Sequence, residues 1–179
     1  YLAAEATVPI RALVLALAGP YGDPGTLRRI RGWIERARAD DWIDLDHRIA
    51  DVTFSGLRHA LWRRLIPILV RRPDSPADFI GSLEACMHHD ARGCLGSVRA
   101  PTLVIGGTED RLVPAAQFRE LARLIPGARL ALIEGGGHGI YAERRAAFQG
   151  TIIDFLLAHD APSGSPASSR TLAERPSCS

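Results

Sequence analysis

The stretch that decides the fold is Pro101–Asp110, PTLVIGGTED, together with Leu130–His138, LALIEGGGH. Each contains a short apolar run, TLVI or LALI, which passes into glycines and then reaches one chemically reactive side chain, Asp110 or His138. Short, unbroken apolar runs of this kind are typical of strands that are buried on both faces of a parallel sheet. We therefore expect two strands, each ending beside a residue that can take part in chemistry.

The segment 114–125 between these runs predicts an amphipathic helix. Phe118, Leu121, Ala122 and Ile125 follow at helical spacing, and charged residues occupy the other face. A right-handed strand–helix–strand crossover makes the two strands parallel, with their carboxyl ends at one edge of the sheet. Ligands bind at that edge in open α/β sheets, so an acid and an imidazole that arrive there together form a candidate site.

A third apolar run at 12–17, ALVLAL, stops at Gly19 and predicts another buried strand. Residues 1–6 are expected to be the last turn or two of a helix. The fold class is therefore α/β, with three parallel strands and flanking helices.

The chain divides into a core, an insertion and a tail. Residues 21–97 show helical periodicity broken by prolines, and about 75 residues between two strands far exceed a minimal crossover. We interpret 21–97 as a helical cap, and 1–20 with 98–160 as the core. Residues 142–159 predict one final helix with Phe148, Ile152, Phe155 and Leu156 on one face. Residues 161–179 predict a disordered tail.

The net charge, the cysteines and the length of the apolar runs indicate which kinds of partner and environment to expect. The formal charge is only +2 and the arginines are scattered among the acids, so we expect neither nucleic acid nor a membrane as partner. Three cysteines, Cys86, Cys94 and Cys178, form no C-x-x-C pair, which favours a reduced, cytoplasmic protein. No apolar run reaches the roughly 20 residues that cross a bilayer.

The two motifs resemble those of the α/β-hydrolase fold family. There the strand of the catalytic acid reads much like 101–110 and is followed by a Val-Pro pair, here Val113-Pro114. The next strand leads into a glycine turn with the histidine, here 135–139, GGGHG. The resemblance covers residues 1–158, the C-terminal half of that fold. In the family's strand order the three predicted strands are neighbours, so the resemblance implies that the strand at 12–17 has an unpaired apolar edge, which favours aggregation or pairing with another chain. It implies that Asp110 is the triad acid and His138 the general base, that small esters or amides are the substrates, and that the complete enzyme needs no cofactor and no metal.

The family's nucleophile motif, G-x-S-x-G, does not occur in the sequence. We expect this sequence to begin just after the nucleophile of the complete enzyme. We also expect this chain alone to be inactive on esters and poorly soluble. The resemblance does not choose among esterase, lactonase, epoxide hydrolase, dehalogenase and haloperoxidase. A rival hypothesis is a non-catalytic interaction module or pseudo-enzyme half, which self-associates or pairs with a complementary N-terminal half through its strand edge.

Structural interpretations stand beside the catalytic ones. Asp110 is also a typical turn residue before a proline, and His138 could be a surface histidine. Glu109 and Glu134 are lower-ranked candidates for the acid. The glycine run resembles a phosphate loop only weakly, since it fits no nucleotide motif.

Two further groups have a structural and a functional interpretation. Cys86, His89 and Asp90 have metal-ligand spacing on a helix, but packing is the favoured interpretation because no fourth ligand is evident. Trp33, Trp42 and Trp62 are expected to be core anchors, with the lining of an acyl pocket as the alternative.

Overall fold

The computed structural model describes residues 1–54, 56–69 and 73–160, so the predicted tail at 161–179 lies outside the described residues. Its sheet consists of β1 (Leu13–Ala16), β2 (Thr102–Gly107) and β3 (Arg129–Ile133). The helices are α1 (Leu2–Glu5), α2 (Pro24–Arg38), α3 (Trp42–Thr53), α4 (Gly56–Leu69), α5 (Pro76–Met87), the short 3₁₀ helix η1 (Leu95–Ser97), α6 (Ala115–Leu124), α7 (Ile140–Glu143) and α8 (Arg145–Ala158).

The three strands are parallel and lie in the order β1-β2-β3. Leu15 of β1 pairs with Val104 of β2, and Ile105 of β2 pairs with Ala131 of β3. The central strand β2 is buried along its whole length, as its apolar run predicted. Among the described residues β1 pairs on one side only, so the predicted open edge is present.

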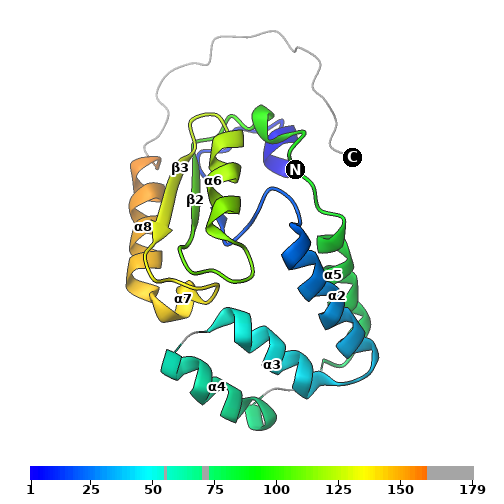
Figure 1. The fold of residues 1–179 in the computed structure, drawn as a ribbon. Coiled ribbons are helices and arrows are strands. Elements are labelled where there is room, and N and C mark those ends of the chain that lie inside the picture. The colour runs from blue at the N-terminus through cyan, green and yellow to red at the C-terminus, as the bar shows by residue number, and fades with distance from the viewer. Residues whose placement is uncertain (55, 70–72, 161–179) are drawn as a thin grey trace, which may run out of the picture.

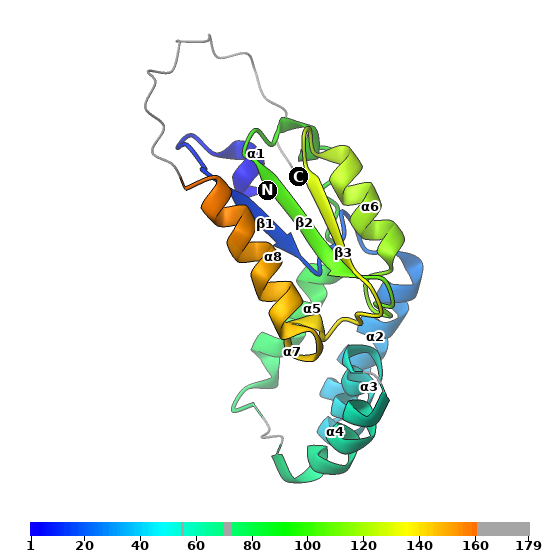
Figure 2. The same cartoon turned by 90° about the vertical axis from the view of Figure 1, so that its left-hand side faces the viewer.

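Helices cover both faces of the sheet, α6 on one side and α8 on the other (Figure 2). Alternate strand residues point to opposite faces. Val104 therefore packs with Phe118 and Leu121 of α6, whereas Leu103 and Ile105 pack with Phe155 of α8. Burial of a side chain such as Phe118 contributes roughly 1.5–3 kcal/mol. The predicted crossover helix at 114–125 is thus confirmed as α6.

Helices α2 to α5 form a second body that extends beyond the sheet (Figure 1). It has its own apolar core, which includes Ile30, Trp33, Ile34, Trp42 and Leu45. Helix α2 begins at Asp23, whose side chain accepts hydrogen bonds from the N–H groups of Gly25 and Thr26. Such a cap contributes about 1 kcal/mol because it satisfies donors that the first helical turn leaves unpaired.

Residues 20–22, which leave the sheet, lie side by side with residues 89–91, which return to it, and together they form a stem for the helical body. The Gly22 N–H donates to the His89 carbonyl at 3.2 Å, and the Ala91 N–H donates to the Pro20 carbonyl at 2.8 Å. Tyr21 and Asp90 form an isolated antiparallel bridge between these bonds. Beyond this stem Ala91 and Leu95 pack with the α6 side of the sheet.

The helix predicted at 142–159 is present as α8, but it differs from the prediction at its start and in one side chain. The single helix expected at 142–159 is divided at Arg144, where φ is −125° and ψ is 39°, because the short α7 must turn the chain before α8 can run along the sheet. Phe148, Ile152 and Phe155 face the sheet, but Leu156 is 42% exposed. On α4, Leu57 and Leu61 are exposed as well, since this outermost helix packs mainly on α3.

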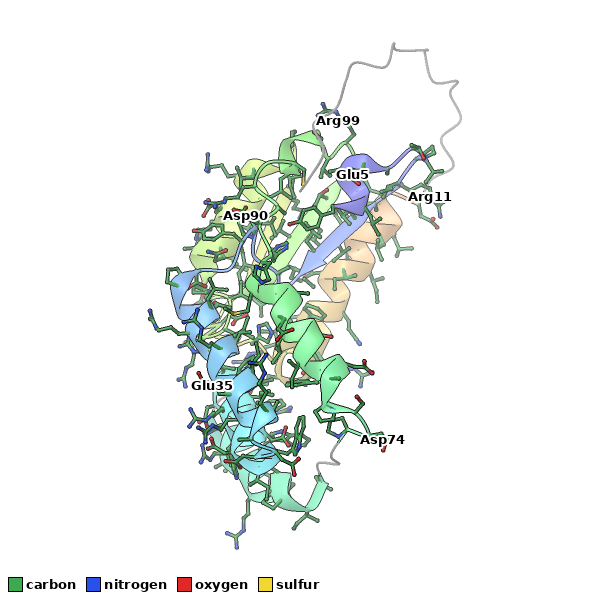
Figure 3. The ribbon with its side chains drawn as sticks, turned by 90° about the vertical axis from the view of Figure 1, so that its right-hand side faces the viewer. Glu5, Arg11, Glu35, Asp74, Asp90 and Arg99 are labelled. Atoms are coloured by element: carbon green, nitrogen blue, oxygen red, sulfur yellow. The ribbon has the colours of Figure 1, made fainter. Side chains whose placement is uncertain are left out.

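Charged side chains lie along the outside of both bodies. Figure 3 shows Glu5, Arg11 and Arg99 around the sheet end of the molecule, Asp90 at its middle, and Glu35 and Asp74 at the helical end. All of these side chains are exposed. Within the described ranges, none of the helices combines the length and hydropathy required to span a bilayer.

Candidate active site

The loop after β2 holds Asp110 in a fixed orientation. Its side chain is 0% exposed, and its Oδ1 accepts hydrogen bonds from the N–H groups of Leu112 and Val113, both at 2.8 Å. This is the turn role expected for an aspartate before a proline. The same turn leaves the second oxygen, Oδ2, available for another partner. The structural and functional interpretations of Asp110 are therefore compatible, because each uses a different oxygen.

His138, from the turn after β3, is that partner. Its Nδ1 lies 2.8 Å from Asp110 Oδ2, and its side chain is 22% exposed. An ionised carboxylate only accepts hydrogen bonds, so Nδ1 carries the proton and donates it in this pair. The neutral ring then keeps the lone pair on Nε2. The structure thus brings together the two residues that the sequence singled out.

Backbone contacts hold the two loops against each other. The Glu109 N–H donates to the Gly136 carbonyl at 2.9 Å, and the Gly135 N–H donates to Thr108 Oγ1 at 2.9 Å. A Cβ on Gly107 would clash with the backbone of Gly136, and Gly135 has a φ of +63°. Glycine is needed at both positions, for close approach in one case and for a left-handed turn in the other.

The helical body reaches both loops. The Gly139 N–H, next to His138, donates to the Thr53 carbonyl at the end of α3 at 2.8 Å. Thr26 of α2 donates its hydroxyl to the Leu112 carbonyl at 2.5 Å. Each half of the candidate pair is therefore connected to a helix from the segment between β1 and β2.

A cavity of about 400 Å³ opens beside His138. Its wall combines the end of β1, the start of α2, the end of α5 and the loop after Asp110, with aliphatic side chains from Leu17, Ile30, Leu112 and Val113. Gln117 of α6 also lines it. Sequence reasoning placed Gln117 only on the predicted helix, because no motif marks a lone glutamine as a ligand contact.

Asp23 adds a negative charge to this wall. Burial raises the pKa of its carboxyl, but the hydrogen bonds from Thr26 and Gly25 and the positive charge of Arg29 outweigh that effect. The pKa of Asp23 therefore lies below its usual value, and the group is ionised at neutral pH. No arginine is among the described residues that line the cavity, although the chain is rich in arginine.

The rival candidates do not contact His138 in place of Asp110, although Cys86 and His89 line the same cavity. Glu109 and Glu134 are exposed, while the buried Asp110 bonds His138. His89 Nε2 lies 3.2 Å from the Gly19 carbonyl and Asp90 pairs with Arg92. In the described part of the chain, no group of three or more potential ligands is suited to hold a metal.

The tryptophans divide between the core and the surface. Trp33 and Trp42 are buried in the helical body, which confirms them as anchors, but Trp62 is 38% exposed. None of the three is among the described residues that line the cavity beside His138.

Comparison with known proteins finds similarity to several hydrolases. A family model described as TAP-like protein, of the α/β-hydrolase type, matches residues 86–167. Polyketide synthase ThaQ of Burkholderia thailandensis is 41% identical over 80 residues, which is 45% of this chain and 4% of that protein. The pimeloyl-acyl-carrier-protein methyl ester esterase of Xanthomonas campestris is 34% identical over 111 residues, 62% of this chain and 40% of the esterase.

Solved structures agree in fold. The enol-lactonase of Burkholderia xenovorans superposes with a TM-score of 0.69 at 27% identity, and the match covers 87% of this chain and 60% of the lactonase. The chain thus spans less than two thirds of the relatives it matches. With its parallel strands, flanking helices and matched motifs, the chain has a partial form of the α/β-hydrolase fold.

Proposed function

We propose that this chain supplies the acid and the base of a serine-type hydrolase that cleaves small esters or amides. The observation that carries the proposal is the 2.8 Å contact between Asp110 Oδ2 and His138 Nδ1 beside a cavity of about 400 Å³. The relatives that are named esterase and lactonase support the reaction class.

In the proposed reaction the pair moves one proton. Asp110 keeps the Nδ1–H tautomer of His138, so Nε2 accepts the proton of a hydroxyl nucleophile as that nucleophile attacks the carbonyl carbon. The same nitrogen then returns the proton to the leaving group. Asp110 stabilises the imidazolium that exists between the two transfers. The nucleophile itself would come from outside these residues, since no G-x-S-x-G occurs in them.

We further propose that α2 to α5, within the segment 21–97, act as a cap. Support comes from Thr26, Ile30 and Cys86 of this segment, which line the same cavity as His138. The bonds from Thr26 to Leu112 and from Gly139 to Thr53 hold the helices over the strand ends. A cap in this position would exclude water and bound the substrate pocket.

The test is ester hydrolysis by the complete gene product. We expect turnover of a methyl or nitrophenyl ester that His138→Ala lowers by at least about 10³-fold, the scale of losing a catalytic base. His159→Ala is the matched control, because this histidine lies at the far end of α8 and bonds only locally to Phe155. Equal losses in both variants, or no turnover by the complete product, would contradict the proposal.

A second candidate, an interaction module, is favoured by the free edge of β1. All four residues of that strand are apolar, and the described residues pair it on one side only. Nearby, Leu156 and Leu157 of α8 are exposed, and they line a hollow together with Ala12 and the polar residues Arg11, His159 and Asp160. Under this candidate the 179-residue chain self-associates, which light scattering after size-exclusion chromatography would detect. A stable monomer would count against it.

A further inference from the structure

One buried polar atom of a cavity-lining residue has no partner among the described residues. Gln117, in the first turn of α6, is only 6% exposed, and no described residue forms a hydrogen bond with its Oε1. Nearly all buried polar side-chain atoms are satisfied in folded proteins, and leaving one unsatisfied costs about 1–3 kcal/mol. This cost indicates that a ligand forms a hydrogen bond with the carboxamide oxygen.

The neighbours of Gln117 place this atom at the site. Gln117 is among the residues that line the same cavity as His138. A Cβ on Gly19, at the end of β1, would lie only 2.5 Å from Gln117 Oε1, so the oxygen occupies the space that a side chain at position 19 would take. The missing side chain of Gly19 is therefore what lets the carboxamide reach this part of the wall.

The rest of the wall defines the group that would satisfy the oxygen. An acceptor needs a donor, and the side chains of Leu17, Ile30, Leu112 and Val113 supply none. The lining also contains side chains that can donate, those of Tyr21, Thr26, Cys86, His89 and His138, but among the described residues none of them bonds Gln117 Oε1. Asp23 is an acceptor when ionised and is occupied by its own helix cap. The described lining contains no arginine that would bind a carboxylate or phosphate. The complementary substrate is thus largely apolar, carries no negative charge and bears one hydroxyl or N–H group.

We infer that Gln117 is a specificity-determining residue, which accepts a hydrogen bond from a hydroxyl or N–H group of the substrate. The inference rests on the proposed hydrolase function, because it assigns a substrate class to that same site. A site built to pair a substrate hydroxyl discriminates strongly against the analogue that lacks it, since the analogue leaves a buried polar group unpaired.

The kinetic test uses the complete gene product with methyl hexanoate and analogues that carry one hydroxyl at successive carbons of the acyl chain. At one position we expect a higher kcat/KM for the hydroxylated ester, and Gln117→Leu should lower that preference ratio about tenfold. Gly19→Ala should lower it as well, because the new methyl group displaces the carboxamide. Gln149→Leu is the matched control, since this exposed glutamine on α8 bonds to Arg145.

Stability separates this role from a structural one. Replacing an unpaired buried acceptor by an apolar group of similar size is neutral or stabilising, so the Tm of Gln117→Leu should equal or exceed that of the wild type. A Tm that falls by several degrees would show that Gln117 supports the fold and would overturn the inference. A preference ratio that is unchanged in both Gln117→Leu and Gly19→Ala would overturn it too.

A binding readout keeps the inference testable if no ester is turned over, the result that would reject the proposed function. The side-chain amide signals of Gln117, identified by their loss in Gln117→Leu, are followed by NMR during titration with cyclohexanol and with methoxycyclohexane. The two probes differ in having and lacking a donor. We expect shifts with cyclohexanol that are much larger than with its ether. Equal shifts, or none with either probe, would mean that water alone satisfies the oxygen and would overturn the inference.

Discussion

Asp110 divides its carboxylate between two tasks, holding its own loop through Oδ1 and His138 through Oδ2 at 2.8 Å. Because the loop bonds fix the carboxylate, the imidazole meets a partner that is already oriented. This arrangement predicts that the two tasks can be separated by substitution.

Asp110→Asn should preserve the loop conformation but abolish most of the catalytic activity. The asparagine oxygen can still accept from Leu112 and Val113, but its NH₂ faces His138 Nδ1 and moves the ring proton to Nε2. We expect kcat of the complete gene product to fall about 10⁴-fold while stability changes little. Imidazole ¹⁵N shifts would report the tautomer. Asp110→Ala should also lose about 1–3 kcal/mol for the unpaired loop donors, and an Asn variant with wild-type kcat would contradict the assignment.

Gly106→Ala should destabilise the sheet. The ring of Phe118 occupies the space that a Cβ at this position would take, and a buried ring between sheet and helix has little room to move. Overpacking of this kind costs typically 1–3 kcal/mol. Gly150→Ala is the control: nothing lies within 4 Å of its Cβ position in α8, so the gain in helix propensity should stabilise by roughly 0.5–1 kcal/mol. Urea unfolding measures the free energy of unfolding of both variants. Equal changes in the two variants would contradict the close packing of Phe118 on Gly106.

Thr26→Val should loosen the connection between α2 and the loop of Asp110. The change removes the hydroxyl that donates to the Leu112 carbonyl at 2.5 Å and also contacts the Asp23 carboxylate. We expect a loss of about 1 kcal/mol in the free energy of unfolding, with rescue by Thr26→Ser. Thr151→Val, where the hydroxyl bonds the Ala147 carbonyl within an exposed helix turn, should change stability much less. If Thr151→Val lowers the free energy of unfolding as much as Thr26→Val does, the hydrogen bond from Thr26 to the Leu112 carbonyl does not stabilise the fold.

The stem of the helical body should respond to acid through Asp90. Side-chain hydrogen bonds from Arg92 are the main reason that the pKa of Asp90 is lowered from 3.8 to about 2. The folded state therefore favours the carboxylate, and this contribution is present above pH 3.8 and lost as the pH falls towards 2.

Carboxyl NMR titration of Arg92→Ala should move the pKa of Asp90 back towards 3.8. Arg99→Ala is the control, since that guanidinium bonds the Gly96 carbonyl and should leave the pKa of Asp90 near 2. An unshifted pKa in Arg92→Ala would remove Arg92 as the cause.

Several features were predictable because they depend on local patterns. Apolar runs with glycine ends marked β2 and β3, and helical spacing marked α6. The rule that parallel strands share a carboxyl edge placed Asp110 and His138 together before any distance was known. The break at Arg144 and the exposed side of α4 escaped prediction, since helical spacing shows which residues share a face but not whether another element covers it.

The sequence by itself determined the strands, the crossover and the identity of the acid and the imidazole, because those follow from short-range periodicity and a topological rule. Only the tertiary structure decided that Asp110 serves its loop and His138 at once and that Thr26 reaches Leu112. It also decided that Gln117 Oε1 is buried with no partner in the described part of the chain. Such contacts join residues far apart in the chain, and they depend on ångström-scale packing that no spacing of residue types encodes.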